Sequence, residues 1–183
     1  GCLLMLTTVT RPLARVMRAA AQHGGVPMPF ATAQDTIEAL ESAIDAAALG
    51  RRSLGEGGCD VLVFSGGSSV GHRDLIMDVI AARGEILFHG IAVKPGKPTA
   101  FGVIQGKPVF GMPGYPTSCL SNGYILLAPA LRQIARLPPT RLKIVTAPLS
   151  RRIVSATGRH QFYTVRLENG QAVPAFKASG DIT

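Results

Sequence analysis

The feature that constrains the fold of this chain most is the apolar run at residues 60–64, Asp60-Val61-Leu62-Val63-Phe64. A continuous run of this kind, without polar alternation, is typical of a strand buried on both faces of a parallel sheet. It leads straight into a glycine- and serine-rich segment at residues 65–71, which is followed by a helical pattern over about 74–83. A strand, a glycine-rich turn and a helix in this order indicate a sheet covered by helices.

Helical and strand-like patterns alternate from the start of the chain to Leu137. The sequence pattern predicts strands over 3–9, 26–30, 60–64, 84–92 and 110–112. It predicts a hairpin over 98–109 with its turn at 105–107. Helices are expected from residue 10 to a stop at 23–25, and over 36–49, 74–83 and 117–137. Pro27 and Pro29 restrict the second strand to an edge of the sheet. We therefore expect an α/β fold over residues 1–138, with three layers, a mostly parallel sheet and an irregular N-terminal part.

The pattern changes after Pro138-Pro139. Short strands are expected at 142–149, 151–155, 161–168 and 171–177, with turns at Thr157-Gly158 and Asn169-Gly170, the latter a good hairpin signal. We expect residues 139–183 to be the incomplete start of a small all-β domain. Because the chain begins at Gly1 rather than Met and stops at Thr183 without a terminating pattern, we also expect it to be a piece of a longer protein.

The net charge of +8 admits two interpretations. Nucleic-acid binding usually requires a dense basic stripe with stacking aromatic residues. Here the positive residues are scattered, and the densest pairs are Arg51-Arg52 and Arg151-Arg152. A site for an anionic small molecule needs only a few well-placed cations, and we favour that interpretation.

The cysteines and the N-terminus exclude other classes of protein. Cys2, Cys59 and Cys119 lack the spacing of a zinc site and do not indicate a disulfide framework. Residues 1–6 are apolar, but they are too few to span a membrane and lack the basic start of a signal peptide. We expect a cytoplasmic protein that binds neither nucleic acid nor a membrane.

Residues 65–71, Ser65-Gly66-Gly67-Ser68-Ser69-Val70-Gly71, form the first candidate site. Glycines allow backbone N–H groups to converge and serines add hydroxyl donors, so the loop can hold a phosphate-like anion at a helix N-terminus. The alternative is an ordinary tight strand–helix turn.

Asp74 is either a first-turn carboxylate favoured by the helix dipole or, beside a phosphate, a ligand of Mg²⁺ through water. Asp35 also lies at a helix start and is an N-cap unless the fold brings it near Asp74.

The segment Lys94-Pro95-Gly96-Lys97-Pro98 is the second candidate site. Its two prolines fix the backbone and remove N–H groups, so both lysines can converge on one oxyanion from a stiff loop. The alternative is a solvated basic turn.

The segment 113–118, Pro113-Gly114-Tyr115-Pro116-Thr117-Ser118, ends a strand and opens a helix. It is either a plain N-cap, through Thr117 or Ser118, or the opposite wall of the same pocket.

Three other residues have chemically active side chains, but we expect structural roles for them. Cys119 is one turn into the last helix without a histidine nearby to activate it, so we expect a small buried residue. His72 and His89 are isolated in the sequence and are expected in core or surface positions.

Three segments in order, SGGSSVGHRD (65–74), VKPGKPTAFG (93–102) and GKPVFGMPGYPTS (106–118), resemble those of the molybdopterin molybdenumtransferases, the MoeA and gephyrin E-domain family. The resemblance covers residues 30–137 well. The combination of KPGKP with PGxP is highly specific, whereas SGGxSVG is shared with related molybdopterin-binding and competence-protein domains. The resemblance implies a molybdopterin-binding α/β domain over 1–138, followed by the start of a barrel-like β domain.

The activity implied by this resemblance is the transfer of molybdate to adenylylated molybdopterin, with AMP released in a Mg²⁺-dependent step of molybdenum cofactor biosynthesis. Lys94 and Lys97 match the molybdate-binding lysines and, with Asp74, the catalytic set. Asp74 and Asp35 match the acidic, metal-binding positions. The positions implied to contact molybdopterin are Ser65, Gly66, Gly67, Ser69, Gly71, Pro113, Gly114, Pro116 and Ser118.

Members of the family carry two further domains before this region, so the resemblance implies a homodimer in the full-length form. A molybdopterin adenylyltransferase is the implied pathway partner. The sequence departs from the pattern at Thr164, where many members place an arginine, and in a longer loop at 51–58. Two alternatives to the enzyme remain: a non-catalytic molybdopterin-binding or scaffold module of the gephyrin type, and a nucleotide pyrophosphatase related to competence proteins. The KPGKP segment counts against the pyrophosphatase.

Overall fold

The computed structural model of the chain describes residues 2–7, 10–30, 33–34, 36–49, 58–66, 74–155 and 157–175. Its strands are β1 (Cys2–Thr7), β2 (Val26–Pro29), β3 (Val61–Ser65), β4 (Gly84–His89), β5 (Val93–Lys94), β6 (Ala100–Ile104), β7 (Lys107–Met112), β8 (His160–Gln161), β9 (Val165–Glu168) and β10 (Gln171–Pro174). Its helices are α1 (Thr10–Gln22), α2 (Ile37–Leu49), α3 (Leu75–Arg83), α4 (Pro116–Asn122), the π-helical turn η1 (Gly123–Leu127) and α5 (Ala128–Ile134).

Six strands form one sheet in the order β2-β1-β3-β7-β6-β4. The first four run parallel to one another, and β6 and β4 continue the sheet in antiparallel fashion. β2, which carries Pro27 and Pro29, is an edge strand, as its prolines predict. The predicted α/β class with a mainly parallel sheet is therefore confirmed.

β3 lies at the centre of the sheet and is buried along its whole length. Because side chains alternate across a strand, Leu62 and Phe64 pack on one face of the sheet and Val61 and Val63 on the other. All four are at most 2% exposed. The apolar run at residues 60–64 thus contains a strand that is covered on both faces.

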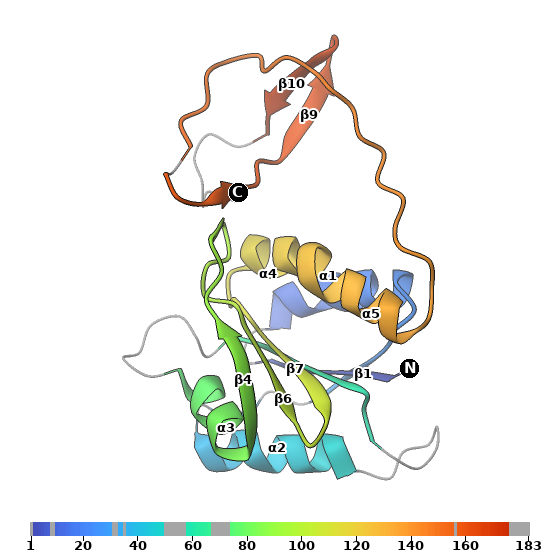
Figure 1. The fold of residues 1–183 in the computed structure, drawn as a ribbon, viewed down its shortest axis with the longest axis vertical. Helices are drawn as coiled ribbons and strands as arrows, with labels where there is room; N and C mark the ends of the chain where they lie inside the picture. The colour runs from blue at the N-terminus through green and yellow to red at the C-terminus, as the bar shows by residue number, and fades with distance from the viewer. Residues whose placement is uncertain are drawn as a thin grey trace.

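Helices cover both faces of this sheet, which gives the expected three layers (Figure 1). α2 and α3 lie on one face, where Leu40, Ile44 and Ile80 pack with β3. α1, α4, η1 and α5 lie on the opposite face, where Val16 and Leu127 belong to a second core cluster. None of the helices in the described ranges is long and apolar enough to cross a membrane.

The long helix predicted over 117–137 is divided in the structure into α4, η1 and α5. Pro129 lies in the first turn of α5 and has no N–H to donate to the carbonyl four residues earlier. The π turn takes up this break, because the N–H of Ala128 donates to the carbonyl of Gly123, five residues back. The strand expected at 110–112 likewise differs: it is the second half of β7, which continues the hairpin to Met112.

The C-terminal segment contains less regular structure than the sequence predicts. β9 and β10 form the expected hairpin around Asn169-Gly170, with Glu168 opposite Gln171 and positive φ at both turn residues. The runs at 142–149 and 151–155 are extended but are not strands. Leu142 and Ile144 are 78% and 85% exposed, so the sequence predicted strands where the described residues offer no neighbouring ladder.

Candidate anion-binding site

The candidate site is built where β3 and β7 end. These strands are neighbours and run parallel, so their carboxyl ends reach the same edge of the sheet. The N–H of Gly66 donates to the carbonyl of Met112 at 3.4 Å, and a Cβ added at Gly114 would lie 3.4 Å from the Cα of Gly66. The helices that follow the two strands, α3 and α4, pack on opposite faces of the sheet. Open α/β sheets bind their ligands at strand ends arranged in this way.

Of the predicted glycine-rich loop, the structure describes the first two residues. Ser65 is buried, and its hydroxyl lies 3.6 Å from the thiol of Cys119 in α4. Gly66 is also buried, with positive φ. Gly67, Ser69 and Gly71, together with His72 and Asp35, lie outside the described residues.

Cys119 is the buried residue that the sequence predicts, with no exposed surface. Burial raises the pKa of its thiol, while the hydrogen bond with Ser65 acts in the opposite direction. The thiol is inaccessible and joins α4 to β3, which fits the structural role that the sequence predicts.

Asp74 is the N-cap of α3. Its Oδ1 accepts a hydrogen bond from the N–H of Met77 at 3.4 Å, so Asp74 caps the helix and does not lie in its first turn, where the sequence placed it. Its Oδ2 lies 3.7 Å from Nε2 of His89, at the end of β4. The side chain of Asp74 is 20% exposed and that of His89 is 47% exposed. One carboxylate oxygen therefore caps the helix, and the other faces His89. The sequence had indicated no contact between His89 and Asp74.

Arg83 fixes the other end of α3 to α2. Its guanidinium bonds the carboxylate of Asp45 and donates to the carbonyl of Glu41 at 3.2 Å. The hydrogen bond to Asp45 raises the pKa of Arg83. The helix that carries Asp74 is thus attached to its neighbour by a charged pair as well as by core contacts.

The lysine loop, residues 94–98, runs from β5 towards β6. Lys94 is half-buried, Gly96 is buried and Lys97 is exposed, and the Lys94–Pro95 peptide bond is cis. β5 pairs in parallel with β8, and the carbonyl of Lys94 accepts a hydrogen bond from the N–H of Phe162 at 2.9 Å. The C-terminal segment therefore supports one end of the loop.

The middle of the lysine loop is held by carbonyl hydrogen bonds. The carbonyl of Gly96 accepts from Oγ1 of Thr99 at 2.9 Å and from Nδ2 of Asn122 at 2.8 Å. The carbonyl of Lys97 accepts from the N–H groups of Ile91 at 3.0 Å and Thr99 at 2.8 Å. These acceptors are directed to partners within the protein, so the hydrogen bonds hold the backbone of the loop in place.

A chain of contacts brings Asp74 and the lysine loop to the same end of the molecule. Asp74 faces His89, and the next residue, Gly90, donates its N–H to the carbonyl of Thr99 at 2.8 Å. Thr99 in turn bonds Gly96 at the centre of the loop. Asn122 is a member of this group that sequence reasoning missed, although a polar residue among the apolar positions of a predicted helix was a possible signal.

The segment after β7 forms the wall between Gly66 and α4. Pro113 is buried and Gly114 is half-buried beside Gly66, whereas Pro116 is exposed at the first position of α4. The N-cap of α4 is Tyr115, and it makes no side-chain cap hydrogen bond. The capping role considered for Thr117 or Ser118 is therefore wrong, because the proline starts the helix one residue earlier. Ser118 is 9% exposed.

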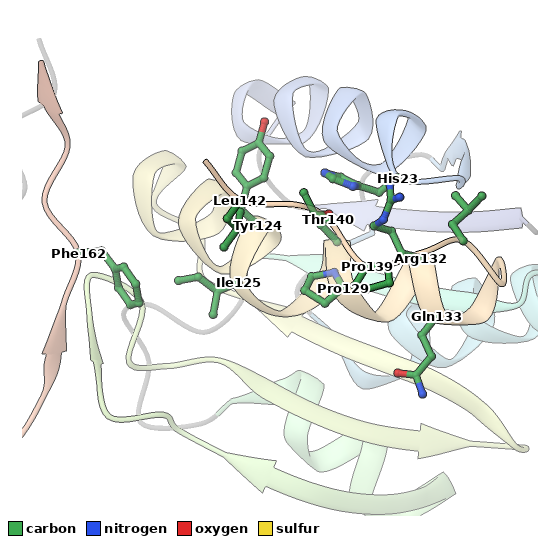
Figure 2. Close-up of a pocket in the computed structure, with 12 residues that line it drawn as sticks. His23, Tyr124, Ile125, Pro129, Arg132, Gln133, Pro139, Thr140, Leu142 and Phe162 are labelled. Atoms are coloured by element: carbon green, nitrogen blue, oxygen red, sulfur yellow. The ribbon is translucent and has the colours of Figure 1, made fainter. Parts of the chain in front are cut away.

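A cavity of about 760 Å³ lies along η1 and α5 and reaches Phe162, whose N–H supports the lysine loop (Figure 2). Its walls include Tyr124, Pro129 and Arg132 from the helices and Leu142 from the extended C-terminal segment, and they are largely apolar. None of Asp74, Lys94 and Lys97 lines it. This cavity is therefore not the one that the sequence predicts for an anion.

Comparison with known proteins identifies the family. Residues 10–133 match the family model described as a "probable molybdopterin binding domain", which is more than half of the chain. The chain belongs to this family of molybdopterin-binding domains. The match covers both lysines of the loop, Asp74 and the strand ends.

Curated relatives and solved structures agree with this family. The chain is 34% identical over 117 residues to a molybdopterin molybdenumtransferase of Haemophilus influenzae, a match that covers 61% of this chain and 29% of the relative. It is 29% identical over 166 residues to molybdopterin molybdenumtransferase 2 of Mycobacterium tuberculosis, with 84% of this chain and 38% of the relative covered.

Among solved structures, a molybdopterin biosynthesis MoeA protein of Pyrococcus horikoshii is 35% identical, with a TM-score of 0.74 over 98% of this chain and 45% of that chain. A molybdenum cofactor biosynthesis protein of Pyrococcus furiosus has the same TM-score at 23% identity, which supports the fold alone. The chain thus spans less than half the length of the two curated relatives and of the P. horikoshii protein.

Proposed function

We propose that the protein containing this chain transfers molybdate to adenylylated molybdopterin and releases AMP. The observation that carries the proposal is the lysine loop, whose carbonyls are bonded within the protein while Lys94 and Lys97 flank a buried glycine. A stiff pair of cations at the carboxyl edge of a parallel sheet is suited to a small oxyanion beside a phosphate-bearing ligand. The family match supports molybdopterin as that ligand.

The fit of Mg²⁺ rests on Asp74. One of its oxygens caps α3 and the other, Oδ2, faces the partly exposed His89, so Oδ2 is the oxygen that would hold the ion. No group of three His, Cys, Asp or Glu side chains gathers anywhere in the described ranges. Mg²⁺ commonly takes one or two carboxylates and completes its shell with water and substrate phosphates, and Asp74 would supply one of these carboxylates. We propose Asp35 as a second carboxylate.

The remaining assignments follow from this placement. Ser65, Gly66, Gly67, Ser69 and Gly71 would contact the phosphate end of the pterin, and Pro113, Gly114, Pro116 and Ser118 would form the facing wall. The hydroxyl of Ser65 is directed to Cys119, so its contribution would come from the backbone. Lys94 and Lys97 would neutralise the oxyanion and orient it towards the pterin.

Beyond this chain, we propose a cytoplasmic homodimer that receives its substrate from a molybdopterin adenylyltransferase. Residues 139–183 would begin a second domain of β structure. The competing function is a molybdopterin-binding scaffold without turnover. It predicts pterin binding with no molybdate-dependent release of AMP.

The lysine assignment is tested in the full-length protein by measuring AMP release from adenylylated molybdopterin as molybdate is varied. Lys97→Ala should reduce release by about 30-fold or more, because truncating one partner of a charged contact that the bound substrate desolvates costs about 2–5 kcal/mol. Lys143→Ala removes an exposed lysine from the extended C-terminal segment and should leave the rate unchanged. Full activity in Lys97→Ala would refute the assignment, and an inactive wild-type protein with intact pterin binding would favour the scaffold.

The Asp74 assignment requires a substitution that preserves the helix cap. Asn caps helices about as well as Asp, so Asp74→Asn retains the acceptor for Met77 while it removes the charge that attracts a metal. The variant should unfold at the same urea concentration as the wild type but require at least tenfold more Mg²⁺ for half-maximal AMP release. An unchanged Mg²⁺ requirement would show that Asp74 serves α3 as a cap and nothing more.

A further inference from the structure

Asn122, the last residue of α4, is a polar side chain with no exposed surface. Its Nδ2 donates to the carbonyl of Gly96 at 2.8 Å and to Oγ1 of Thr99 at 2.5 Å. These contacts reach across 26 and 23 residues of sequence. Asn122 therefore connects the helix after β7 to the middle of the lysine loop.

The amide of Asn122 occupies the space that a side chain at residue 96 would need. A Cβ added at Gly96 would lie 2.3 Å from Nδ2 and 2.7 Å from Oδ1 of Asn122. Gly96 has a φ of +107°, so its backbone turns there in a way that favours glycine. The amide and the glycine thus fit directly against each other, which fixes the loop between Pro95 and Pro98.

The oxygen of the Asn122 side-chain amide, Oδ1, is buried and accepts no hydrogen bond in the described structure. Leaving a buried acceptor unsatisfied is costly, and an apolar residue in this position of the core would avoid that cost. The feature that an apolar residue cannot supply is the Nδ2 donor to the loop.

The π turn directly after Asn122 shapes the local geometry. Gly123, its first residue, is also buried, and its added Cβ would lie 3.8 Å from Val16 of α1. Asn122 therefore faces the lysine loop while its neighbour packs against α1. π turns inside α-helices occur frequently at functional sites.

We infer that Asn122 is a positioning residue for the lysine loop, which it holds through the Gly96 carbonyl and Thr99 so that Lys94 and Lys97 stay directed at one oxyanion. This inference rests on the proposed molybdate transfer. Asn122 has no exposed surface, so its effect would be on the placement of the two ammonium groups. Loss of its amide should weaken molybdate binding more than it slows the chemical step.

The test compares Asn122→Ala with wild type in the full-length protein. The KM for molybdate should rise about tenfold, the equivalent of one net hydrogen bond, while kcat changes less than threefold. Molybdate alone, titrated by calorimetry, should bind correspondingly more weakly. Amide hydrogen exchange at residues 94–99 should be faster in the variant, which is a readout independent of activity.

Matched variants separate positioning from folding. Leu127→Ala shortens a buried side chain of the adjacent π turn and should lower stability without altering the KM for molybdate. Thr99→Val should reproduce the effect of Asn122→Ala, because it removes the hydroxyl that bonds Gly96, and Thr99→Ser should retain wild-type values. These threonine variants carry the test if Asn122→Ala does not fold.

Two failures are distinguishable. If the wild-type protein releases no AMP with molybdate, the proposed function fails and the inference falls with it. If the wild type is active but Asn122→Ala and Thr99→Val keep its KM and its exchange rates at 94–99, the inference alone is overturned. A rise in KM that Leu127→Ala reproduces at equal loss of stability would also overturn it.

Discussion

The contact between Gly96 and Asn122 can be measured by a double-mutant cycle. Gly96→Ala introduces a Cβ whose position would be 2.3 Å from Nδ2 of Asn122, at a backbone φ of +107°. Two costs follow: backbone strain of about 1–3 kcal/mol and overpacking against the buried amide of about 1–3 kcal/mol. The expected loss in the free energy of unfolding is therefore about 2–6 kcal/mol.

Asn122→Ala should reduce this cost. With the amide removed, the Cβ at residue 96 has space and the strain alone remains. The double variant should therefore be more stable than the sum of the single effects predicts, by about 1–3 kcal/mol. Urea unfolding followed by circular dichroism gives all four free energies of the cycle.

Gly106 provides the control. It also has positive φ, +75°, but a Cβ added there meets nothing within 4 Å. Gly106→Ala should thus cost only the strain, about 1–2 kcal/mol, and its effect should add to that of Asn122→Ala within about 0.5 kcal/mol. The reasoning is refuted if Gly96→Ala and Asn122→Ala are additive as well, because the amide would then not be what excludes a side chain from residue 96.

Two further predictions concern the core. Leu62→Ala, in the centre of β3, should lower the free energy of unfolding in urea by about 2–5 kcal/mol. Leu142→Ala, at a position that is 78% exposed, should change it by less than about 0.5 kcal/mol. Similar values for both variants would contradict the described packing. Because burial raises the pKa of Cys119 above the ordinary thiol value of about 8.5, the folded state keeps the thiol proton longer than the unfolded state. Its contribution to stability is complete below that pH and is lost as the pH rises through the folded pKa. Unfolding in urea from pH 7 to 10 should therefore show a steeper fall for wild type than for Cys119→Ala, and parallel curves would count against the raised pKa.

The parallel part of the fold was readable from the sequence because its signals are local. The run at 60–64 has no polar residue between Val61 and Phe64, and the structure buries that strand on both faces. Pro27 and Pro29 placed β2 at an edge for an equally local reason, the missing N–H groups.

Strand pairing, by contrast, depends on a partner elsewhere in the chain. The run at 142–149 was predicted to be a strand, yet its residues are exposed apart from the half-buried Ala147, and the described residues show a single bridge between Leu149 and Ala172. A local apolar pattern does not supply the neighbouring strand.

The same distinction applies to the candidate site. The prolines and lysines of residues 94–98 indicated a stiff cationic loop, and the hydrogen bonds of the structure are consistent with that stiffness. The partners of the loop were not readable, because Asn122 and Phe162 reach it from 26 and 68 residues away along the chain. His89 was likewise missed, since its neighbour Asp74 lies on the preceding helix cap.

The short ladder between β5 and β8 has a mechanical consequence. His160 and Phe162 donate their N–H groups to the carbonyls of Ala92 and Lys94, so the C-terminal segment is hydrogen-bonded to the backbone of a lysine of the loop. A displacement of that segment by one residue of register would shift the point of attachment by about 3.3 Å, roughly the length of a hydrogen bond. The segment thereby fixes the backbone position of Lys94. Substitutions in β8 that leave both lysines unchanged would still alter the position of Lys94.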